Sequence, residues 1–452
     1  MSKNQIYQRL SVLKRSRAII GSGLLLSATF ASFTANSQTL TLEQAVEQVS
    51  QYQASQQFWE TQNRINQSNI QQSKLFKNPE LSVEQTGFNS KDDKELAIGI
   101  SQPLDIFGER KANQKLANIA QDKTELNQKI YQAKLQLVVK YLWSQLAIAE
   151  LEKSIIKEQL RVSEDNLNAI QKRFSAGSLA EVDVNRARLS HEENMRLYRQ
   201  ADLQWQVVAH QLSNLWGVAD KTISVNLTAQ KLWPSAVHQQ VQNYLANNYM
   251  EKYRIIQVKE SEMTVNVLKA KARPNPTVNA GVNQVRTANA ESENQFVVGV
   301  SVPLHIFDRQ QYGLQIAKAK QELLARQQDF YLKQNALQIG TLLTELQGLN
   351  VQFKEVDQTQ IPLAVQVQSK TLQGFTAGKF ALTDVQQATL QLQDVRLRKI
   401  QLLKDAWQKA LEAESMSLGI APSEVMSKDA LAVINQNLWQ DIQAMPVIGG
   451  GN

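Results

Sequence analysis

Two aspartates are the first residues in this sequence whose positions point to chemistry. Asp183 and Asp384 each follow a glycine that ends a predicted helix, and each stands at the start of the next predicted helix. Exposed carboxylates attract cations, and rings of such side chains are what cation-selective channels use. Acidic residues in the first turn of a helix are also favoured by its dipole, so a structural role stays open beside the functional one.

The histidines do not have the spacing of a metal site. There are four of them: His191, His210, His238 and His305. None has a histidine or a carboxylate four residues further along, the spacing that places two ligands on one face of a helix. Glu192 and Glu193 follow His191 directly and therefore point to other faces of the predicted helix. We predict no metal site and no cofactor.

No arrangement of residues typical of an enzyme is present. The sequence has no G-x-S-x-G motif, no glycine-rich phosphate loop and no cysteine. It also has no paired carboxylates with a supporting pocket motif. We therefore predict that the protein is not an enzyme and that any transport it supports draws its energy from a partner.

Residues 1–37 have the pattern of a secretory signal peptide. Five cations and no acid precede a short run of apolar and small residues, 18–33, and small residues before position 38 fit a cleavage site after Ser37. Removing this segment lowers the formal net charge from +7 to 7 − 5 = +2, so the basic character gives no support to nucleic-acid binding. An exported chain without cysteine has no disulfide framework.

The remainder of the sequence is a duplication. SQPLDIFGERKA at 101–112 recurs as SVPLHIFDRQQY at 301–312, and RFSAGSLAEVDVNRARL at 173–189 recurs as GFTAGKFALTDVQQATL at 374–390. Asn78-Pro79 recurs as Asn275-Pro276. We place the first repeat at residues 38–235, the second at 236–420 and a C-terminal tail at 421–452.

Each repeat is predicted to contain a helix, two strands and a long helical hairpin. Helices at 42–77 and 236–273 end at Asn-Pro, because proline disfavours helix in the residue before it. Strands follow at 80–88 and 95–104, and at 277–286 and 294–304, on period-two alternation. Long helices follow at 110–173 and 309–373, with return helices at 180–215 and 380–418. A helix of that length reaches about 95 Å, and Pro362 is expected to kink the third long helix.

The strand pattern has one apolar face. Large apolar residues alternate with small or polar ones, so the apolar set is predicted to face lipid and the other set a lumen. The predicted lipid-facing residues are Leu96, Ile98, Ile100, Phe296, Val298, Val300 and Val302. Four strands cannot close a barrel, whereas two chains give eight strands and three give twelve, which leave a pore. A protein outside the membrane with hairpins that cap a sheet is the alternative.

The turns between the long helices are the predicted far end of the molecule. Gly177 and Gly378 are positioned to end helices in a left-handed conformation. Exposed turns are the parts that a partner protein can reach, and apolar neighbours would supply contact area. These neighbours are Phe174, Leu179, Phe375 and Phe380. Internal packing of the same side chains is the alternative.

The order of these elements resembles the outer-membrane efflux protein family, also called the TolC family, over about residues 42–420. The resemblance implies a homotrimer whose duplicated helical hairpins form an α-barrel in the periplasm. Four strands per chain would then contribute to a 12-stranded transmembrane β-barrel in the outer membrane. It also implies a periplasmic adaptor protein and an inner-membrane RND transporter as partners, with Asp183 and Asp384 near the periplasmic aperture. Some relatives carry a further aspartate where this chain has Gln387, so any acidic ring is thinner here.

Within the family, three segments look most similar to the heavy-metal branch, which confers cobalt, zinc and cadmium resistance. They are NPELSVE, SQPLDIFGERKA and SVPLHIFDRQQYG. The resemblance therefore implies efflux of zinc, cadmium or cobalt. A duct for drugs or other small organic molecules is an alternative of the same class. A coiled-coil surface protein with no transport role is an alternative of another class.

Overall fold

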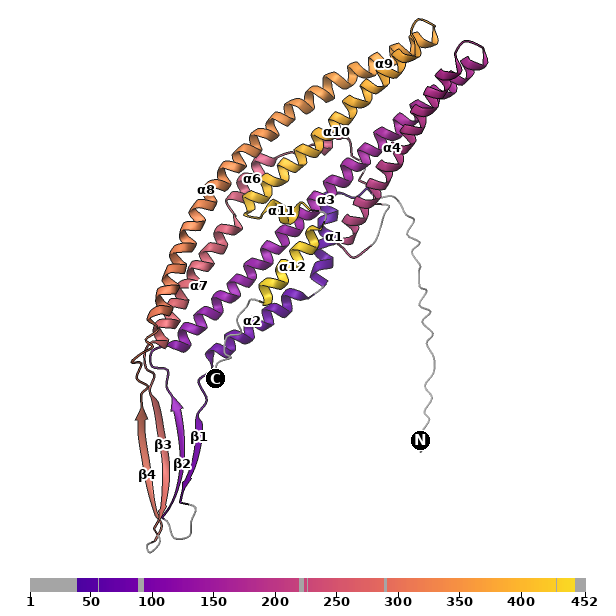
Figure 1. Ribbon diagram of the computed structural model, residues 1–452. Coiled ribbons are helices and arrows are strands. Elements are labelled where there is room, and N and C mark those ends of the chain that lie inside the picture. The colour runs from indigo at the N-terminus through magenta and orange to yellow at the C-terminus, as the bar shows by residue number, and fades with distance from the viewer. Residues whose placement is uncertain are drawn as a thin grey trace, which may run out of the picture. The chain divides into compact units, whose positions relative to one another are not determined.

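The computed structural model describes residues 39–55, 57–87, 93–218, 223–225, 227–287, 291–427 and 429–443. The predicted signal peptide, 1–37, lies outside these residues, as do positions 444–452 of the predicted tail. Within residues 39–443, Figure 1 shows a sheet at one end of a set of long helices. At the other end are two turns, each of which connects one long helix to the next.

Two long helical hairpins make up most of this unit (Figure 1). The first consists of α3 (Glu109–Ser175, 67 residues) and α4 (Glu181–Asn214). The second consists of α8 (Gln311–Glu355), a π-helical turn η1 (Val356–Gln360), α9 (Ile361–Thr376) and α10 (Leu382–Leu418). Leu126, Leu137 and Ile148, eleven residues apart along α3, form part of an apolar seam and are all buried. The four predicted long and return helices are thus present, with bounds shifted by a few residues.

Pro362 lies directly after the π-helical turn. The backbone N–H of Ile361 donates to the carbonyl of Val356, five residues back, instead of four. Proline has no N–H and its ring crowds the carbonyl four residues back in an α-helix. The wider turn at 356–360 is where the hydrogen-bond ladder changes register before this proline, and the helix continues as α9.

The sheet is antiparallel with strand order β1-β2-β3-β4. Its strands are β1 (Glu80–Thr86), β2 (Lys94–Pro103), β3 (Thr277–Arg286) and β4 (Glu293–Ser301). The helix α2 (Phe58–Lys74) leads into the first hairpin and α7 (Tyr249–Lys271) into the second. The order helix, two strands, long helix and return helix therefore occurs twice, as the duplicated sequence predicts, and β2 pairs with β3 to join the halves.

The two helices that precede the strands are broken, whereas the sequence predicted continuous ones. The expected helix 42–77 is α1 (Leu42–Ser55) and α2, with Gln57 in the left-handed region at φ 49°. The expected helix 236–273 is α6 (Val237–Leu245) and α7, and the Asn248 side chain caps α7 by accepting from the Glu251 N–H at 3.0 Å. Neither break contains glycine or proline.

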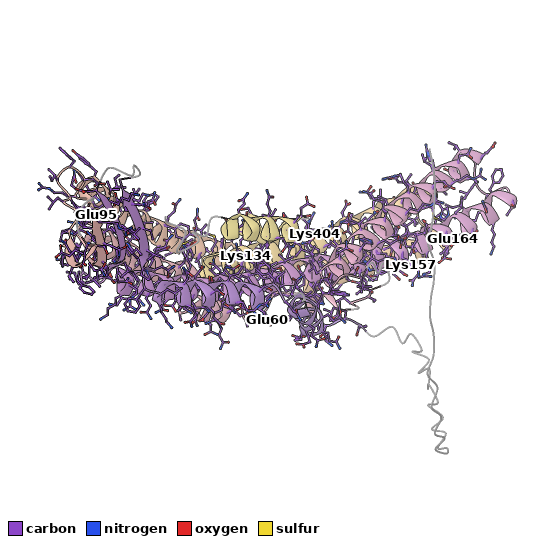
Figure 2. The ribbon with its side chains drawn as sticks, turned by 90° about the horizontal axis from the view of Figure 1, so that it is seen from below. Glu60, Glu95, Lys134, Lys157, Glu164 and Lys404 are labelled. Carbon is purple, nitrogen blue, oxygen red and sulfur yellow. The ribbon has the colours of Figure 1, made fainter. Side chains whose placement is uncertain are left out.

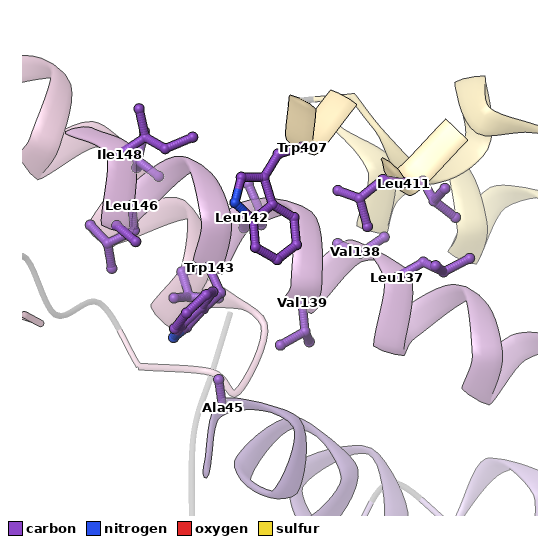
Figure 3. Packing of buried hydrophobic residues seen from close by; sticks show 14 of the residues in the cluster. Ala45, Leu137, Val138, Val139, Leu142, Trp143, Leu146, Ile148, Trp407 and Leu411 are labelled. Atoms are coloured by element: carbon purple, nitrogen blue, oxygen red, sulfur yellow. The ribbon is translucent and has the colours of Figure 1, made fainter. Parts of the chain in front are cut away.

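Short helices form a layer around the middle of the long ones. Besides α1 and α6 these are α5 (Ala229–Leu232), α11 (Pro422–Val425) and α12 (Ala430–Gln443). They enclose a continuous apolar core in which Leu146, Leu212 and Leu403 are fully buried. Figure 3 shows the indoles of Trp143 and Trp407 within it, with ring centroids 6.3 Å apart and planes at 68°. Burial of these large apolar side chains stabilises the middle of the molecule.

Both tryptophans also use their polar edge. The Trp143 indole N–H donates to the carbonyl of Leu40 at 3.1 Å, and the Trp407 indole N–H donates to that of Leu232 at 2.7 Å. These bonds hold the segments that flank α1 and α5 against the long helices. None of the helices among the described residues combines the length and the apolar character that a membrane crossing requires.

Candidate functional site

The register of the sheet places most of its large apolar side chains on one face. Residues directly opposite in neighbouring strands share a face. One row across the four strands is Leu81, Ile100, Ala280 and Val298. The next row is Val83, Ile98, Val282 and Phe296. Phe296 is 85% exposed and Val298 79%, so no described part of the chain covers this face.

All the predicted lipid-facing positions within the sheet fall on this same face. Leu96 stands opposite Gln284 on it, and Val300 stands opposite Val278. Val302 follows the end of β4 and is 48% exposed. The strand register confirms that these side chains share one face, whereas contact of that face with lipid stays a prediction.

The opposite face of the sheet carries acids, amides and small residues, together with Val285 and Val297. Glu80, Glu84, Glu95 and Glu293 have the parity of this face. No lysine or arginine shares it among the described strand residues, since Lys94 and Arg286 pair on the apolar face. Gly99 stands opposite Gly281, and a Cβ on Gly281 would come within 2.8 Å of the Ile98 carbonyl oxygen. The amide of Asn283 donates to Glu95 at 3.0 Å.

The turns at the other end of the hairpins have the same geometry. After α3, the N–H of Gly177 donates to Phe174 O at 2.8 Å and that of Ser178 to Arg173 O at 2.9 Å. After α9, Gly378 donates to Phe375 O at 3.0 Å and Lys379 to Gly374 O at 2.8 Å. These are Schellman motifs, and φ is 74° at Gly177 and 72° at Gly378. The predicted helix-ending role of both glycines is confirmed.

Asp183 and Asp384 both occupy the third position of a return helix. The Asp384 carboxylate accepts from the Ala381 N–H at 2.8 Å and so satisfies a backbone donor at the start of α10. Asp183 lies 3.9 Å from Arg186, an exposed pair of small energetic weight. Asp384 therefore has the structural role at the start of a helix that was the alternative to a functional one. Its carboxylate is nevertheless exposed, so a role in attracting cations is compatible with this bond.

The apolar side chains at the turns divide into two groups. Phe375 is only 4% exposed and packs with Ile170, Val184 and Leu382 between the two hairpins, with Leu179 against the same cluster. For these two residues the alternative of internal packing holds. Phe174 and Phe380 are 42% and 48% exposed and are available to a partner.

The absence of a side chain on Gly374 leaves the space that the Phe380 ring occupies. A Cβ on Gly374 would lie 2.1 Å from Cδ2 of Phe380, so the ring rests on the glycine backbone. The first repeat has Arg173 and Leu179 at the matching positions. The two turns therefore share their backbone but present different side chains.

A groove of about 420 Å³ runs between the hairpins near these turns. It is lined by both apolar and polar side chains of α3, α4 and α10, among them Ile170 and Leu390 beside Gln159, Asn194 and Gln393. Gln159 donates to Gln393 at 2.5 Å, and further from the turns Lys404 pairs with Glu152 at 2.8 Å. Figure 2 shows Lys404 near the middle of the helices, with Lys157 and Glu164 further toward the turns and Glu95 at the sheet end. Polar contacts thus hold one hairpin to the other.

One ion pair is buried in the middle layer. The Lys140 Nζ lies 2.6 Å from Glu414, whose side chain is 1% exposed, and also donates to Gln240 at 3.1 Å. Burial raises the pKa of the Glu414 carboxyl, and the ammonium of Lys140 opposes that rise. This pair joins α3, α6 and α10.

Three of the histidines form hydrogen bonds, each with a different partner. His191 lies 3.2 Å from the Ser163 hydroxyl, His210 3.0 Å from the Asn214 amide, and His305 3.0 Å from the Ala272 carbonyl. Over the part of the chain that the structure describes, there is no group of three or more His, Cys, Asp or Glu side chains that could hold a metal ion.

The acids on the polar face of the sheet were not among the site residues predicted from the sequence. The signal was present, because Glu80 and Glu84 alternate with Leu81 and Val83 in the first strand. Once the apolar face is assigned, parity alone places these carboxylates opposite it.

The architecture and sequence are similar to those of known export proteins. Residues 66–218 match the outer membrane efflux protein family. The sequence is 26% identical to the cobalt-zinc-cadmium resistance protein CzcC of Cupriavidus metallidurans over 351 residues, which cover 75% of this chain and 81% of CzcC.

Two solved structures share the fold. The outer membrane protein VceC of Vibrio cholerae aligns with a TM-score of 0.65 and 16% identity over 84% of this chain and 96% of VceC. CusC, whose structures concern folding and transmembrane channel formation, aligns with a TM-score of 0.64 and 16% identity over 84% of this chain and 92% of CusC. The predicted combination of helical hairpins with a small β part is therefore confirmed as the fold of these channels.

Proposed function

We propose that the chain belongs to the outer membrane efflux protein family and that it forms the outer-membrane exit channel of a tripartite system that exports divalent heavy-metal cations. Three copies give twelve strands, enough to enclose a pore. The sheet lies in the outer membrane and the helices project into the periplasm. An adaptor protein and an inner-membrane RND transporter complete the system and supply the energy.

The observation that carries the proposal is the two-sided sheet. Its apolar face, with Val298 and Phe296, is uncovered, and its other face bears only acids among its charged residues in the described strands. Strands in an outer-membrane barrel present apolar side chains to lipid and polar ones to the lumen. In a trimer, the carboxylates of Glu80, Glu84 and Glu95 would line the exit with negative charge.

Heavy-metal cations are the cargo that this lining and the sequence favour together. Rings of carboxylates favour the passage of cations. The relative CzcC carries cobalt, zinc and cadmium resistance in its name, and that cargo is proposed here for this chain. Asp183 and Asp384, proposed to lie near the periplasmic aperture, would add carboxylates at the entrance.

The turns are the proposed adaptor-docking surface. Phe174 and Phe380 are exposed there, and Gly177 and Gly378 allow the chain to reverse at these points. Aromatic side chains are favoured anchors in protein interfaces. Phe375 and Leu179 support the surface from beneath, because they pack between the hairpins.

A matched pair of substitutions tests the membrane orientation of the sheet. Val298→Lys places a charge on the apolar face, and Gly299→Lys places the same charge one residue away, on the polar face, where a Cβ meets no atom within 4 Å. A cation facing lipid costs about 2–4 kcal/mol at the bilayer centre. We expect Val298→Lys to reduce the trimer recovered in outer-membrane fractions severalfold and Gly299→Lys to leave it unchanged. Equal recovery of both variants would refute the orientation.

Cargo is tested by deletion of the encoding sequence and complementation with the wild-type chain. We expect the deletion to lower tolerance to zinc, cadmium or cobalt and to raise cellular accumulation of the metal, with both restored by the wild type. Unchanged metal tolerance with increased sensitivity to dyes or antibiotics would instead favour a duct for organic molecules. A chain recovered outside the membrane fractions would refute the channel altogether.

A further inference from the structure

A basic groove lies where the sheet joins the helices. It has a volume of about 380 Å³ and is formed by the first turns of α3 and the last turns of α7. Its charged lining residues are Lys111, Lys115, Lys269 and Arg273, and no acid lines it. The Phe107 ring closes one side, with the Arg273 guanidinium 5.6 Å from the ring centroid.

The four cations of this groove are not neutralised by the described part of the chain. All four side chains are exposed, and none has a carboxylate within 4.0 Å among the described residues. The nearby acid Glu109 pairs with Lys271 at 4.0 Å, and Asp105 accepts the backbone N–H groups of Glu109 and Arg110 at 2.8 Å each. Four like charges in one groove repel one another, so an anion bound there relieves that repulsion.

Exposed apolar side chains occur in the segments that join the strands to the helices, the same region of the chain as the groove. β2 ends at Pro103 and α3 begins at Glu109, while α7 ends at Lys271 and β3 begins at Thr277. Near these junctions the uncovered side chains are Leu75, Phe76, Ile106, Leu304, Ile306 and Phe307. Phe307 is 91% exposed. Apolar and aromatic side chains at a strand end mark the boundary between hydrocarbon and water in membrane sheets.

Arg110, beside the groove, also combines a cation with an exposed apolar ring. Its guanidinium lies 3.9 Å from the centroid of the exposed Phe76 ring, and its Nη1 donates to the Lys74 carbonyl at 3.0 Å. A cation held above an exposed ring suits a place where an apolar layer meets a charged one. The junction therefore offers an apolar rim and a basic groove together.

We infer that this groove binds the phosphate of an anionic phospholipid, such as phosphatidylglycerol, from the membrane leaflet that faces the helices. The four cations contact the phosphate and the apolar rim contacts the acyl chains. A free phosphate would use the cations but leave the rim exposed, and basic pockets at a membrane surface are the usual sites for anionic headgroups. The inference rests on the proposed placement of the sheet in the outer membrane.

The test is lipid retention by the intact trimer. Trimers are reconstituted in nanodiscs of phosphatidylethanolamine with one-fifth phosphatidylglycerol, and co-purified lipid is counted by native mass spectrometry. The variant carries Lys111→Gln, Lys115→Gln, Lys269→Gln and Arg273→Gln. The matched control changes Lys157, Lys172, Lys354 and Lys370 to Gln, four exposed lysines on the long helices without an ion pair among the described residues. A third chain changes Lys111, Lys115 and Lys269 to Arg.

We expect wild type, control and Arg chain to retain phosphatidylglycerol, and the groove variant to retain roughly tenfold less. Equal retention by the groove variant and wild type, or saturation of the groove by glycerol phosphate without any preference for the lipid, would overturn the inference. A groove variant that fails to form trimers is replaced by the pairwise variants K111Q/K115Q and K269Q/R273Q, with the same criteria. Loss of lipid in trimers that still insert and export metal leaves the proposed function intact, whereas a wild-type chain that does not insert refutes the proposed function itself.

Discussion

The guanidinium of Arg173, at the end of α3, lies 4.6 Å from the ring centroid of Phe375, at the end of α9. Its Nη1 also donates to the Phe375 carbonyl at 3.4 Å. Arg173 belongs to the first hairpin and Phe375 to the second, so this contact joins the two turns directly. The second repeat has Gly374 at the position of Arg173, and the contact therefore has no counterpart in the other direction.

Replacing Arg173 should uncouple the two turns. We expect Arg173→Ala and Phe375→Leu each to increase amide hydrogen exchange in residues 167–179 and 370–382. In a double-mutant cycle, the coupling between them should be about 0.5–2 kcal/mol, the range for a cation near an aromatic ring. Lys172→Ala removes an exposed neighbouring cation and serves as the control. Additive effects of the two substitutions would show that the contact carries no coupling.

Gly374→Ala should disturb the second turn by displacing Phe380. The new Cβ would lie 2.1 Å from the Phe380 ring, so the ring must move. We expect a loss of stability of about 1–3 kcal/mol locally, as for overpacking, and weaker adaptor binding in a pull-down assay. Gly348→Ala in α8, where a Cβ meets no atom within 4 Å, should instead stabilise that helix by about 0.5–1 kcal/mol.

A second substitution separates crowding from other effects of Gly374→Ala. Adding Phe380→Ala removes the ring that the new methyl meets, and local exchange rates should then return toward those of Phe380→Ala alone. If the double variant is as disturbed as the sum of its parts, crowding against Phe380 is not the cause.

The sequence predicted most of the long elements because their signals are local and repeated. The apolar seam of α3 and the alternation in β2 and β4 each follow from spacing within a single segment. The helix break near Gln57 lacks such a signal, and neither this break nor the one near Ala246 contains glycine or proline. Asn248 followed by Glu251 resembles a capping motif and could have indicated the second break.

The site was predictable only in part, for a related reason. Phe174 and Phe375 stand at matching positions of the duplicated turns, yet one is exposed and the other buried. Their difference arises from Arg173 and the neighbouring hairpin, which a single repeat does not reveal. Likewise, the basic groove depends on two helices brought together by the pairing of β2 with β3, although the flanking segments RKANQK and KAKAR were visible.

Removal of one partner from the buried pair Lys140–Glu414 should destabilise the middle layer. Glu414→Leu leaves the Lys140 ammonium without its carboxylate, at a cost of about 3–5 kcal/mol. The double variant Lys140→Met with Glu414→Leu should be closer to wild type, because no buried charge is left unpaired. Heat dissociation of the purified trimer compares the three proteins, and a double variant no better than the single one would contradict this account.

The buried Glu414 carboxyl should also make the free energy of unfolding depend on pH. Burial raises the pKa of Glu414 in the folded chain, so the folded state binds this proton more tightly than the unfolded state. Its contribution to the free energy of unfolding therefore falls as pH rises from the ordinary glutamate pKa through the raised one. In Glu414→Gln this slope should disappear. Asp202 is the opposite control, because its hydrogen bond from Lys153 lowers its pKa and its stabilising effect is lost only as pH falls.

The Asp384 side chain accepts a backbone hydrogen bond and also carries a charge, and two substitutions separate the effects of the bond and the charge. Asp384→Asn keeps an oxygen that can accept from the Ala381 N–H, whereas Asp384→Ala removes both the acceptor and the charge. We expect Asp384→Ala to increase hydrogen exchange over residues 381–388, at a cost of about 0.5–1 kcal/mol, and Asp384→Asn to do so less.

The cation preference of the channel should instead follow the charge alone. With Asp183→Asn added, so that both proposed aperture carboxylates are neutral, the reversal potential of reconstituted trimers in a potassium chloride gradient should shift toward lower cation preference. Asp384→Asn and Asp384→Ala should then give equal shifts, despite their different helix stability, because each removes one negative charge per chain. A reversal potential that does not change in any of these variants would leave Asp384 with its bond to Ala381 and no role toward cations.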